Sequence, residues 1–212
     1  MTTNKETARD VALELLKINA IRLNPEDPFT WASGWRSPIY CDNRLSLSYP
    51  ELRSVIKKKL VDLINKEYPD VQVIAGVATA GIPQGALVAD ELEVPMIYVR
   101  SEPKGHGLTN QIEGKVDPGQ RVVVVEDLIS TGGSSLKAVT ALKEAGFEVL
   151  GMVAIFTYGF IQSEERFMKE QVSCYCLSDY SSMLEVALDS NYISSRQLEI
   201  LKRWRTDPAN WS

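Results

Sequence analysis

The chain of 212 residues contains little cysteine, a single histidine and no long apolar run. Its three cysteines are odd in number and form no Cys-x-x-Cys pair, which argues against a disulfide framework or a zinc site and favours a reducing cytoplasm. The longest nearly uninterrupted apolar stretch, residues 149–156, is too short to cross a bilayer. The polar N-terminus also lacks the apolar core of a signal peptide. We therefore expect neither a membrane protein nor a secreted one.

The chain also lacks an excess of positive charge, because 23 Lys and Arg residues are outnumbered by 28 Asp and Glu residues and the formal net charge is −5. Such a balance argues against a general nucleic-acid surface and against a polybasic membrane anchor. The chain does have enough apolar residues, 44% of the total, to bury a core. No repeat, low-complexity stretch or linker divides it, so we expect a single domain over residues 1–212.

Strand and helix patterns alternate through the centre of the chain. Helical spacing of apolar residues is found on either side of this centre, at 5–18, 50–66, 181–188 and 194–205. Short apolar runs predict strands at 71–77, 94–99, 121–126, 148–156 and 172–177, with helical segments between most of them. Because these runs are continuous, we expect an α/β fold with a parallel sheet covered on both faces. Ligands of such sheets bind where the strands end, so the turns after residues 77, 99 and 126 are candidate sites.

The most informative segment is 122–134, in which four valines are followed by two adjacent carboxylates, Glu126 and Asp127. A turn of small residues comes next: Ser130, Thr131, Gly132, Gly133 and Ser134. Amide groups at a helix start, hydroxyls and glycines suit a phosphate, whereas the carboxylates suit sugar hydroxyls, a metal or a developing positive charge. An ordinary capped turn would explain the glycines and serines, but not two carboxylates at the end of a buried strand. The segment is neither a Walker A loop nor a Gly-x-Gly-x-x-Gly turn.

Segment 122–134 resembles the phosphoribosyl-pyrophosphate (PRPP) signature of the type I phosphoribosyltransferase family. The resemblance implies that family's fold: a central, mostly parallel sheet flanked by helices, with a core over about 68–180. A small hood would come from about 20–48 plus C-terminal elements. It also implies that Glu126 and Asp127 contact the ribose and that Asp127 faces an oxocarbenium-like transition state. Within this segment, Leu128, Ile129, Ser130, Thr131, Gly132, Gly133 and Ser134 would also contact PRPP, with residues 130–134 holding its 5-phosphate.

The connection that starts at Arg100 shows no helix or strand pattern over roughly twenty residues, and its first half is cationic. Connections this long inside a domain are typical of functional lids, although a lone histidine in a glycine-rich loop also fits a solvated surface. The segment resembles the lid of the orotate-using members of the family. That implies that Arg100, Lys104 and His106 bind pyrophosphate as catalytic groups, reaching across a homodimer into the neighbouring subunit's site. Ser101 stands where some members carry a lysine.

Residues 76–83 place small residues and a proline-initiated helix after another strand. A tight strand-to-helix turn accounts for this pattern when it is viewed alone. Within the family resemblance, the segment is the pyrophosphate loop, with contacts from Thr79, Ala80 and Gly81. Some members have a lysine at the position of Ala80, so backbone groups would make the contacts here.

Segment 29–44, rich in aromatic residues, resembles the hood of the orotate-using members. A flat anionic base needs apolar or aromatic walls, backbone partners and a cation. The resemblance implies that orotate is contacted by Tyr40, Cys41, Arg44 and Ser130. Ala32 and Tyr158 replace cations found in some members.

The activity implied is transfer of the 5-phosphoribosyl group from PRPP to orotate, which gives orotidine 5′-monophosphate and pyrophosphate in pyrimidine (UMP) biosynthesis. Mg²⁺ would be bound mainly through PRPP, with no dedicated metal ligands. One rival is transfer to a purine or another base, against which the hood and lid segments weigh. The other is a PRPP-sensing regulator that binds nucleic acid, but the sequence has no basic face or added DNA-binding module.

Overall fold

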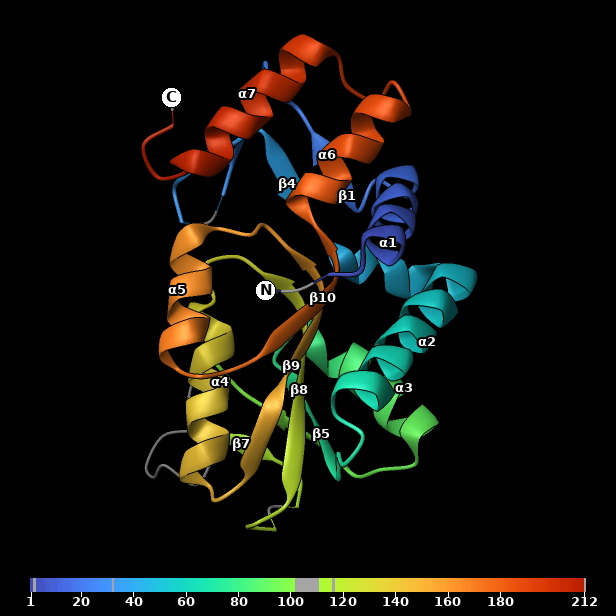
Figure 1. Ribbon diagram of the computed structural model, residues 1–212, viewed down its shortest axis with the longest axis vertical. Coiled ribbons are helices and arrows are strands. Elements are labelled where there is room, and N and C mark those ends of the chain that lie inside the picture. Colours follow the sequence, from blue (N-terminus) through green and yellow to red (C-terminus); the bar gives the residue numbers. More distant parts are fainter. Residues whose placement is uncertain (2, 32, 102–110, 116, 212) are drawn as a thin grey trace.

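A six-stranded sheet forms the centre of the computed structural model, which describes residues 1, 3–31, 33–101, 111–115 and 117–211 (Figure 1). The strand order is β10-β9-β8-β5-β6-β7. All neighbours are parallel except β6 and β7, which are antiparallel. The strands are β5 (Val73–Val77), β6 (Met96–Val99), β7 (Ile112–Glu113), β8 (Arg121–Ile129), β9 (Glu148–Thr157) and β10 (Cys174–Asp179).

Helices cover both faces of this sheet (Figure 1). They are α1 (Lys5–Lys17), α2 (Pro50–Glu67) and α3 (Gly81–Leu92) on one face, and α4 (Gly133–Glu144) and α5 (Ile161–Lys169) on the other. In β8, Val123 and Val125 pack in the core shared with α1 and α2, whereas Val122 and Val124 pack in the core shared with α4. Successive side chains of a strand point to opposite faces of the sheet. A strand that is covered on both faces therefore needs apolar residues at successive positions, and the valine run provides them.

A smaller layer lies beyond one end of the sheet, and we call it the hood (Figure 1). Its elements are β1 (Ile21–Leu23), β2 (Phe29–Thr30), β3 (Arg36–Ser37), β4 (Ile39–Cys41), α6 (Tyr180–Asp189) and α7 (Ser195–Thr206). β1 pairs with β4, and β2 pairs with β3, both antiparallel. A 3-10 helix, η1 (Asn43–Ser48), leads from the hood into α2. Aromatic rings join the two parts, with Trp204 of α7 lying 5.6 Å from Trp31 and 5.8 Å from Tyr158 between ring centroids.

The main helices and strands agree with the sequence-based expectations to within a few residues, and the mostly parallel sheet is confirmed. The expectation that the whole connection after Arg100 lacks a strand was wrong, because β7 pairs with β6 there. The hood strands β3 and β4 are separated at Pro38, which has no N–H to offer a partner strand. Strands of two or three residues are too short to show a periodic pattern. No helix of the described residues is long and apolar enough to cross a membrane.

The point at which the strand order changes direction lies between β5 and β8. The chain runs from β5 outward to β6 and β7, then returns to the other side of β5 as β8. The strand order therefore reverses at this point, which is where open α/β sheets bind their ligands. The turns after β5 and β8 open on the same edge of the sheet, below the hood.

Candidate active site

Glu126 and Asp127 lie at the end of β8, beyond its pairing with β5. Glu126 is 6% exposed, and one of its carboxylate oxygens accepts a hydrogen bond from the Ser135 hydroxyl at 3.1 Å. The other oxygen accepts from the backbone N–H of Asp127, also at 3.1 Å. Burial and the charge of Asp127 raise the pKa of Glu126 well above its usual value.

Burial also raises the pKa of Asp127, although hydrogen bonds with Glu126 and the local backbone, and to a smaller extent the charge of Arg44, counteract part of this effect. Two adjacent, poorly solvated carboxylates are destabilised when both are charged. A cation or a positively charged reaction centre beside them relieves that repulsion. The pair is therefore suited to a metal-bound sugar phosphate or to a cationic transition state.

The turn from Ser130 to Ser134 leads directly into α4. Gly132 has φ +75°, a left-handed conformation, and a Cβ there would lie 2.8 Å from the Phe167 ring. Behind the turn, Arg166 of α5 donates a hydrogen bond from Nη1 to the Thr131 carbonyl at 3.0 Å. The first amides of α4 have no partner within the helix, and no side chain of the described residues caps that end, so they are suited to bind an anion.

The turn after β5 lies directly beside the end of β8. A Cβ at Gly81 would lie 2.5 Å from the Val125 carbonyl oxygen, so only glycine allows this approach. The Ala78 N–H donates to the Val99 carbonyl at 2.8 Å, which ties the turn to the end of β6. Thr79 is exposed, and Ala80 is half-buried. The segment predicted to bind pyrophosphate therefore adjoins the predicted ribose-binding carboxylates.

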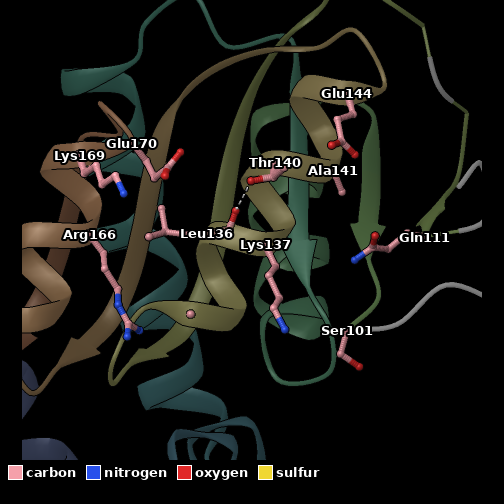
Figure 2. Close-up of a pocket in the computed structure, with 11 residues that line it drawn as sticks. Ser101, Gln111, Leu136, Lys137, Thr140, Ala141, Glu144, Arg166, Lys169 and Glu170 are labelled. Atoms are coloured by element: carbon pink, nitrogen blue, oxygen red, sulfur yellow. Dashed lines mark hydrogen bonds between the residues drawn. The ribbon is translucent and has the colours of Figure 1, made fainter.

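A pocket of about 560 Å³ lies along α4 and α5 (Figure 2). Its lining carries charges of both signs, including Lys137, Glu144 and Arg166. Figure 2 shows Arg166 extending from α5 toward the turn that precedes α4. The pocket shares Gly133 with the small-residue turn, and it contains none of the residues predicted to bind the base.

A smaller pocket of about 430 Å³ lies between the hood and the end of β8. The described side chains that line it carry no formal charge at neutral pH: Thr30, Trp31, Tyr40, Cys41, Leu128, Ser130 and Tyr158. Three of the four residues predicted to contact the base, namely Tyr40, Cys41 and Ser130, are among them. Leu128, which was expected to contact PRPP, also lines it. Burial raises the pKa of Tyr158 well above its usual value, so its hydroxyl stays neutral and able to donate.

Arg44 and Arg100 both have acidic partners. Arg44 donates to Asp42 from Nε at 2.6 Å and from Nη2 at 2.9 Å, and it is not among the described residues that line the smaller pocket. Arg100 lies just after β6, at the same edge of the sheet as the other site residues, and its Nη1 is 3.5 Å from Glu113. Lys104, His106 and Ala32 lie outside the described residues.

Several residues of the site were missed by the sequence-based prediction. Thr30 and Trp31 line the smaller pocket, and the aromatic-rich segment that contains them was the available signal. Tyr158, named from the sequence only as a replacement for a cation found in some members, follows β9 directly, so the rule that ligands bind at strand ends also points to it. Asn43 donates to the Asp127 backbone carbonyl, and Ser135 donates to the Glu126 carboxylate. No pattern in the sequence pointed to either contact.

A family model described as "Phosphoribosyl transferase domain" matches residues 47–189. That range contains the carboxylate pair, the small-residue turn and the loop after β5. The fold and the site thus define the class of protein as a phosphoribosyltransferase.

Similarity to individual proteins identifies the family within this class. An orotate phosphoribosyltransferase from Cytophaga hutchinsonii is 59% identical over 203 residues, which is 96% of this chain and 97% of that protein. The crystal structure of orotate phosphoribosyltransferase from Aeropyrum pernix is 30% identical, with a TM-score of 0.76 over 87% of this chain and 99% of that one. Leishmania donovani UMP synthase gives a TM-score of 0.78 at 27% identity, and the match covers 95% of this chain but 42% of that longer chain. The chain belongs to the orotate phosphoribosyltransferase family, which confirms the resemblance seen in the sequence.

Proposed function

We propose that this protein transfers the 5-phosphoribosyl group of PRPP to orotate, in the pathway of pyrimidine nucleotide biosynthesis. The carrying observation is that Ser130 both begins the small-residue turn and lines the uncharged pocket. The phosphate site and the base site therefore share a wall, with Asp127 close to both. A ribose phosphate bound in the turn presents its anomeric carbon toward the base in such an arrangement.

In this reaction the bond between the anomeric carbon and the pyrophosphate oxygen breaks, and pyrophosphate leaves with the electron pair. A bond forms between the anomeric carbon and a ring nitrogen of orotate, which loses its proton. Positive charge develops on the ribose as the first bond lengthens. The Asp127 carboxylate, held beside the ribose, would stabilise that charge, and such preorganised electrostatic contacts are typically large contributors to catalysis.

The PRPP contacts follow the turns at the sheet edge. The 5-phosphate would bind the turn 130–134 and the preceding Leu128 and Ile129. The carboxylates of Glu126 and Asp127 would accept hydrogen bonds from the ribose hydroxyls. Pyrophosphate would bind the backbone of residues 79–81. Arg100, Lys104 and His106 remain our candidates for the catalytic lid, supported by the sequence resemblance, and of these three only Arg100 lies within the described residues.

The base would occupy the 430 Å³ pocket, against Tyr40, Cys41 and Ser130. Trp31 is fixed there because its indole N–H donates to the Ile39 carbonyl at 3.0 Å. Arg44 is held by Asp42 and is not among the described residues that line this pocket, so its side chain would have to move toward the pocket to contact orotate.

Mg²⁺ fits this site as a companion of PRPP. The raised pKa values of Glu126 and Asp127 support this, because a pair of poorly solvated carboxylates gains from a nearby cation. The described residues contain no group of three or more His, Cys, Asp or Glu side chains able to hold a metal ion. When bound to PRPP, Mg²⁺ supplies charge neutralisation for the leaving pyrophosphate.

We also propose a cytoplasmic homodimer, in which Arg100, Lys104 and His106 of one subunit reach the neighbouring subunit's site. The sequence resemblance of the lid supports this arrangement. A single domain over residues 1–212 is proposed as well, because one apolar cluster joins Ile39 of the hood, Ile56 of α2 and Val123 of β8.

The deciding experiment follows orotate absorbance with PRPP and Mg²⁺, with each omitted in turn. Turnover should require orotate, PRPP and the metal together. Parallel reactions receive uracil, adenine or hypoxanthine in place of orotate. Equal or faster turnover of any of these bases would overturn the assignment to orotate, and PRPP binding without turnover of any base would favour a PRPP-sensing role.

A further inference from the structure

The backbone carbonyl of Asp127 lies where β8 has lost its neighbour on one side. The pairing of β5 with β8 runs from Val73 opposite Val122 to Gly76 opposite Val125, whereas β8 continues to Ile129. On the other side, the register with β9 pairs Glu126 and Leu128 but not Asp127. A carbonyl group in this half-buried position needs a hydrogen-bond donor from elsewhere.

Asn43 of η1 supplies that donor from 84 residues away in the sequence. Its side-chain Nδ2 donates to the Asp127 carbonyl at 2.8 Å, and the residue is 1% exposed. Its Oδ1 accepts from the Cys41 thiol at 3.3 Å. Because a carbonyl oxygen can only accept, the amide nitrogen has to face Asp127, which fixes the orientation of this side chain.

We propose that Asn43 is a positioning residue that holds the backbone at Asp127 and ties it to the wall of the base pocket at Cys41. The inference rests on the proposed function, because it gives Asp127 its role toward the ribose. Cys41 lines the base pocket, and Asp127 adjoins Leu128 of the same lining, so a single buried amide spans from one wall to the other.

The contact acts on geometry. A carboxylate stabilises a developing charge well only when its position is fixed before the reaction, because reorientation during the reaction costs free energy. The Asp127 backbone N–H is already bonded to Glu126, and Asn43 fixes the carbonyl at the other end of the same residue. Without Asn43 the residue would be held on one side only, beyond the end of β5.

The test replaces the amide nitrogen with oxygen in an Asn43→Asp variant of the full chain. The new side chain has almost the same shape, but it cannot donate to Asp127 when charged. We expect kcat with orotate to fall by about 10- to 100-fold, the range for leaving a buried acceptor unpaired, while the KM for orotate changes by less than about threefold. PRPP affinity, measured by calorimetry with Mg²⁺, should also weaken, by about three- to tenfold.

A Ser46→Ala variant is the matched control. The Ser46 hydroxyl donates to the Asn43 backbone carbonyl at 2.6 Å, so this change loosens the same 3-10 turn without touching the Asn43 amide. We expect it to lower the melting temperature and to leave kcat and PRPP affinity within about twofold of wild type. If Ser46→Ala reproduced the kinetic loss of Asn43→Asp, Asn43 would serve only the stability of the turn. A folded Asn43→Asp protein with wild-type kcat and PRPP affinity would also overturn the proposal.

Two further arms separate this inference from the proposed function. If the wild-type protein used another base, the variants would be assayed with that base, and if it turned over no base, PRPP affinity alone would decide. If Asn43→Asp failed to fold, Asn43→Ser would replace it, because a serine hydroxyl retains a donor on a shorter side chain. We expect Asn43→Ser to keep more activity than Asn43→Ala, and equal losses in these two variants would count against the proposal.

Discussion

The turn after β8 and the pocket proposed for the base differ in where their residues lie in the sequence. The turn takes its residues from five consecutive positions, 130–134, and its neighbours Glu126 and Asp127 belong to the same segment. The pocket takes Thr30, Trp31, Tyr40 and Cys41 from the hood, Leu128 and Ser130 from the end of β8, and Tyr158 from the end of β9. One site is local in sequence and the other is assembled by the fold.

The two regions also differ in what a substitution can disturb. At the turns, backbone atoms lie so close together that an added methyl group meets another backbone or a ring. In the pocket, large side chains rest on other large side chains, so a change spreads through packing. Substitutions at the sheet edge should therefore act on PRPP and on the chemical step, and substitutions in the hood should act on the base.

The largest effect is expected from Gly81→Ala. The added Cβ would lie 2.5 Å from the Val125 carbonyl oxygen, so the loop must move away from the carboxylate strand. We expect a loss of about 1–3 kcal/mol in the free energy of unfolding and at least about 100-fold in kcat, measured by thermal unfolding and by the orotate assay.

The matched control for this substitution is Gly119→Ala. Unlike Gly81, Gly119 has a positive φ, +88°, and no atom of the described residues lies within 4 Å of the place that its added methyl group would take. It should cost about 1 kcal/mol of stability and leave kcat unchanged. Wild-type activity in Gly81→Ala would show that the loop after β5 tolerates displacement and takes no part in PRPP binding.

Asp127→Asn should have the next largest effect, because it removes charge while keeping shape. We expect kcat to fall by about 10²- to 10³-fold, with a much smaller change in the KM for orotate. Steady-state kinetics with each substrate varied in turn give both values. A loss that appears entirely in the KM for orotate would move Asp127 from the ribose to the base site.

Trp204→Phe tests the hood side of the comparison. Trp204 is completely buried, and its ring centroid is 5.6 Å from that of Trp31 and 5.8 Å from that of Tyr158, both of which line the pocket. Loss of part of the indole should raise the KM for orotate by about 3- to 10-fold through small shifts of these two rings. PRPP affinity, measured by calorimetry, should stay the same.

Trp211→Phe provides the same chemical change at a half-buried position near the C-terminus. It should leave both substrates unaffected. If Trp204→Phe weakened the binding of PRPP as much as the binding of orotate, the turn after β8 and the pocket would not act independently on the two substrates.

The smallest effect is expected from Glu126→Gln, and it depends on pH. Because the pKa of Glu126 is raised in the folded protein, the folded state holds its proton more tightly than the unfolded state does. That stabilisation is complete below the unfolded value of 4.5 and is lost as pH rises through the folded pKa. The glutamine variant has no such loss, and it also removes a negative charge beside Asp127.

The melting temperature of Glu126→Gln relative to wild type should therefore increase between about pH 5 and about pH 8. Thermal unfolding at these two values checks the sign. A difference that shrinks with rising pH would mean that Glu126 is stabilised in its charged form by the Ser135 hydroxyl and the Asp127 amide.

Much of the fold and one half of the site could be predicted from the sequence. The valine run of β8 and the residues after it carry their structure in their own composition: apolar residues for a strand buried on both faces, then glycines for a turn. The strands of the hood could not be predicted in the same way. β2 and β3 have two residues each, which is too short for a sequence pattern, and they are recognised as strands only because they pair with each other. The pocket residue Tyr158 shows the same limit, since its neighbours in sequence do not reveal which rings it will touch.

The sequence by itself determined the class of chemistry, because carboxylates, glycines and hydroxyls in consecutive order make a sugar-phosphate site through local backbone geometry. Only the tertiary structure decided what lines the pocket proposed for the base, since that pocket is formed by residues far apart in the chain. The hydrogen bond between Asn43 and Asp127 spans 84 residues. Its physical reason is that β5 ends before β8 does, so the free carbonyl of Asp127 is satisfied by the hood instead of by a neighbouring strand.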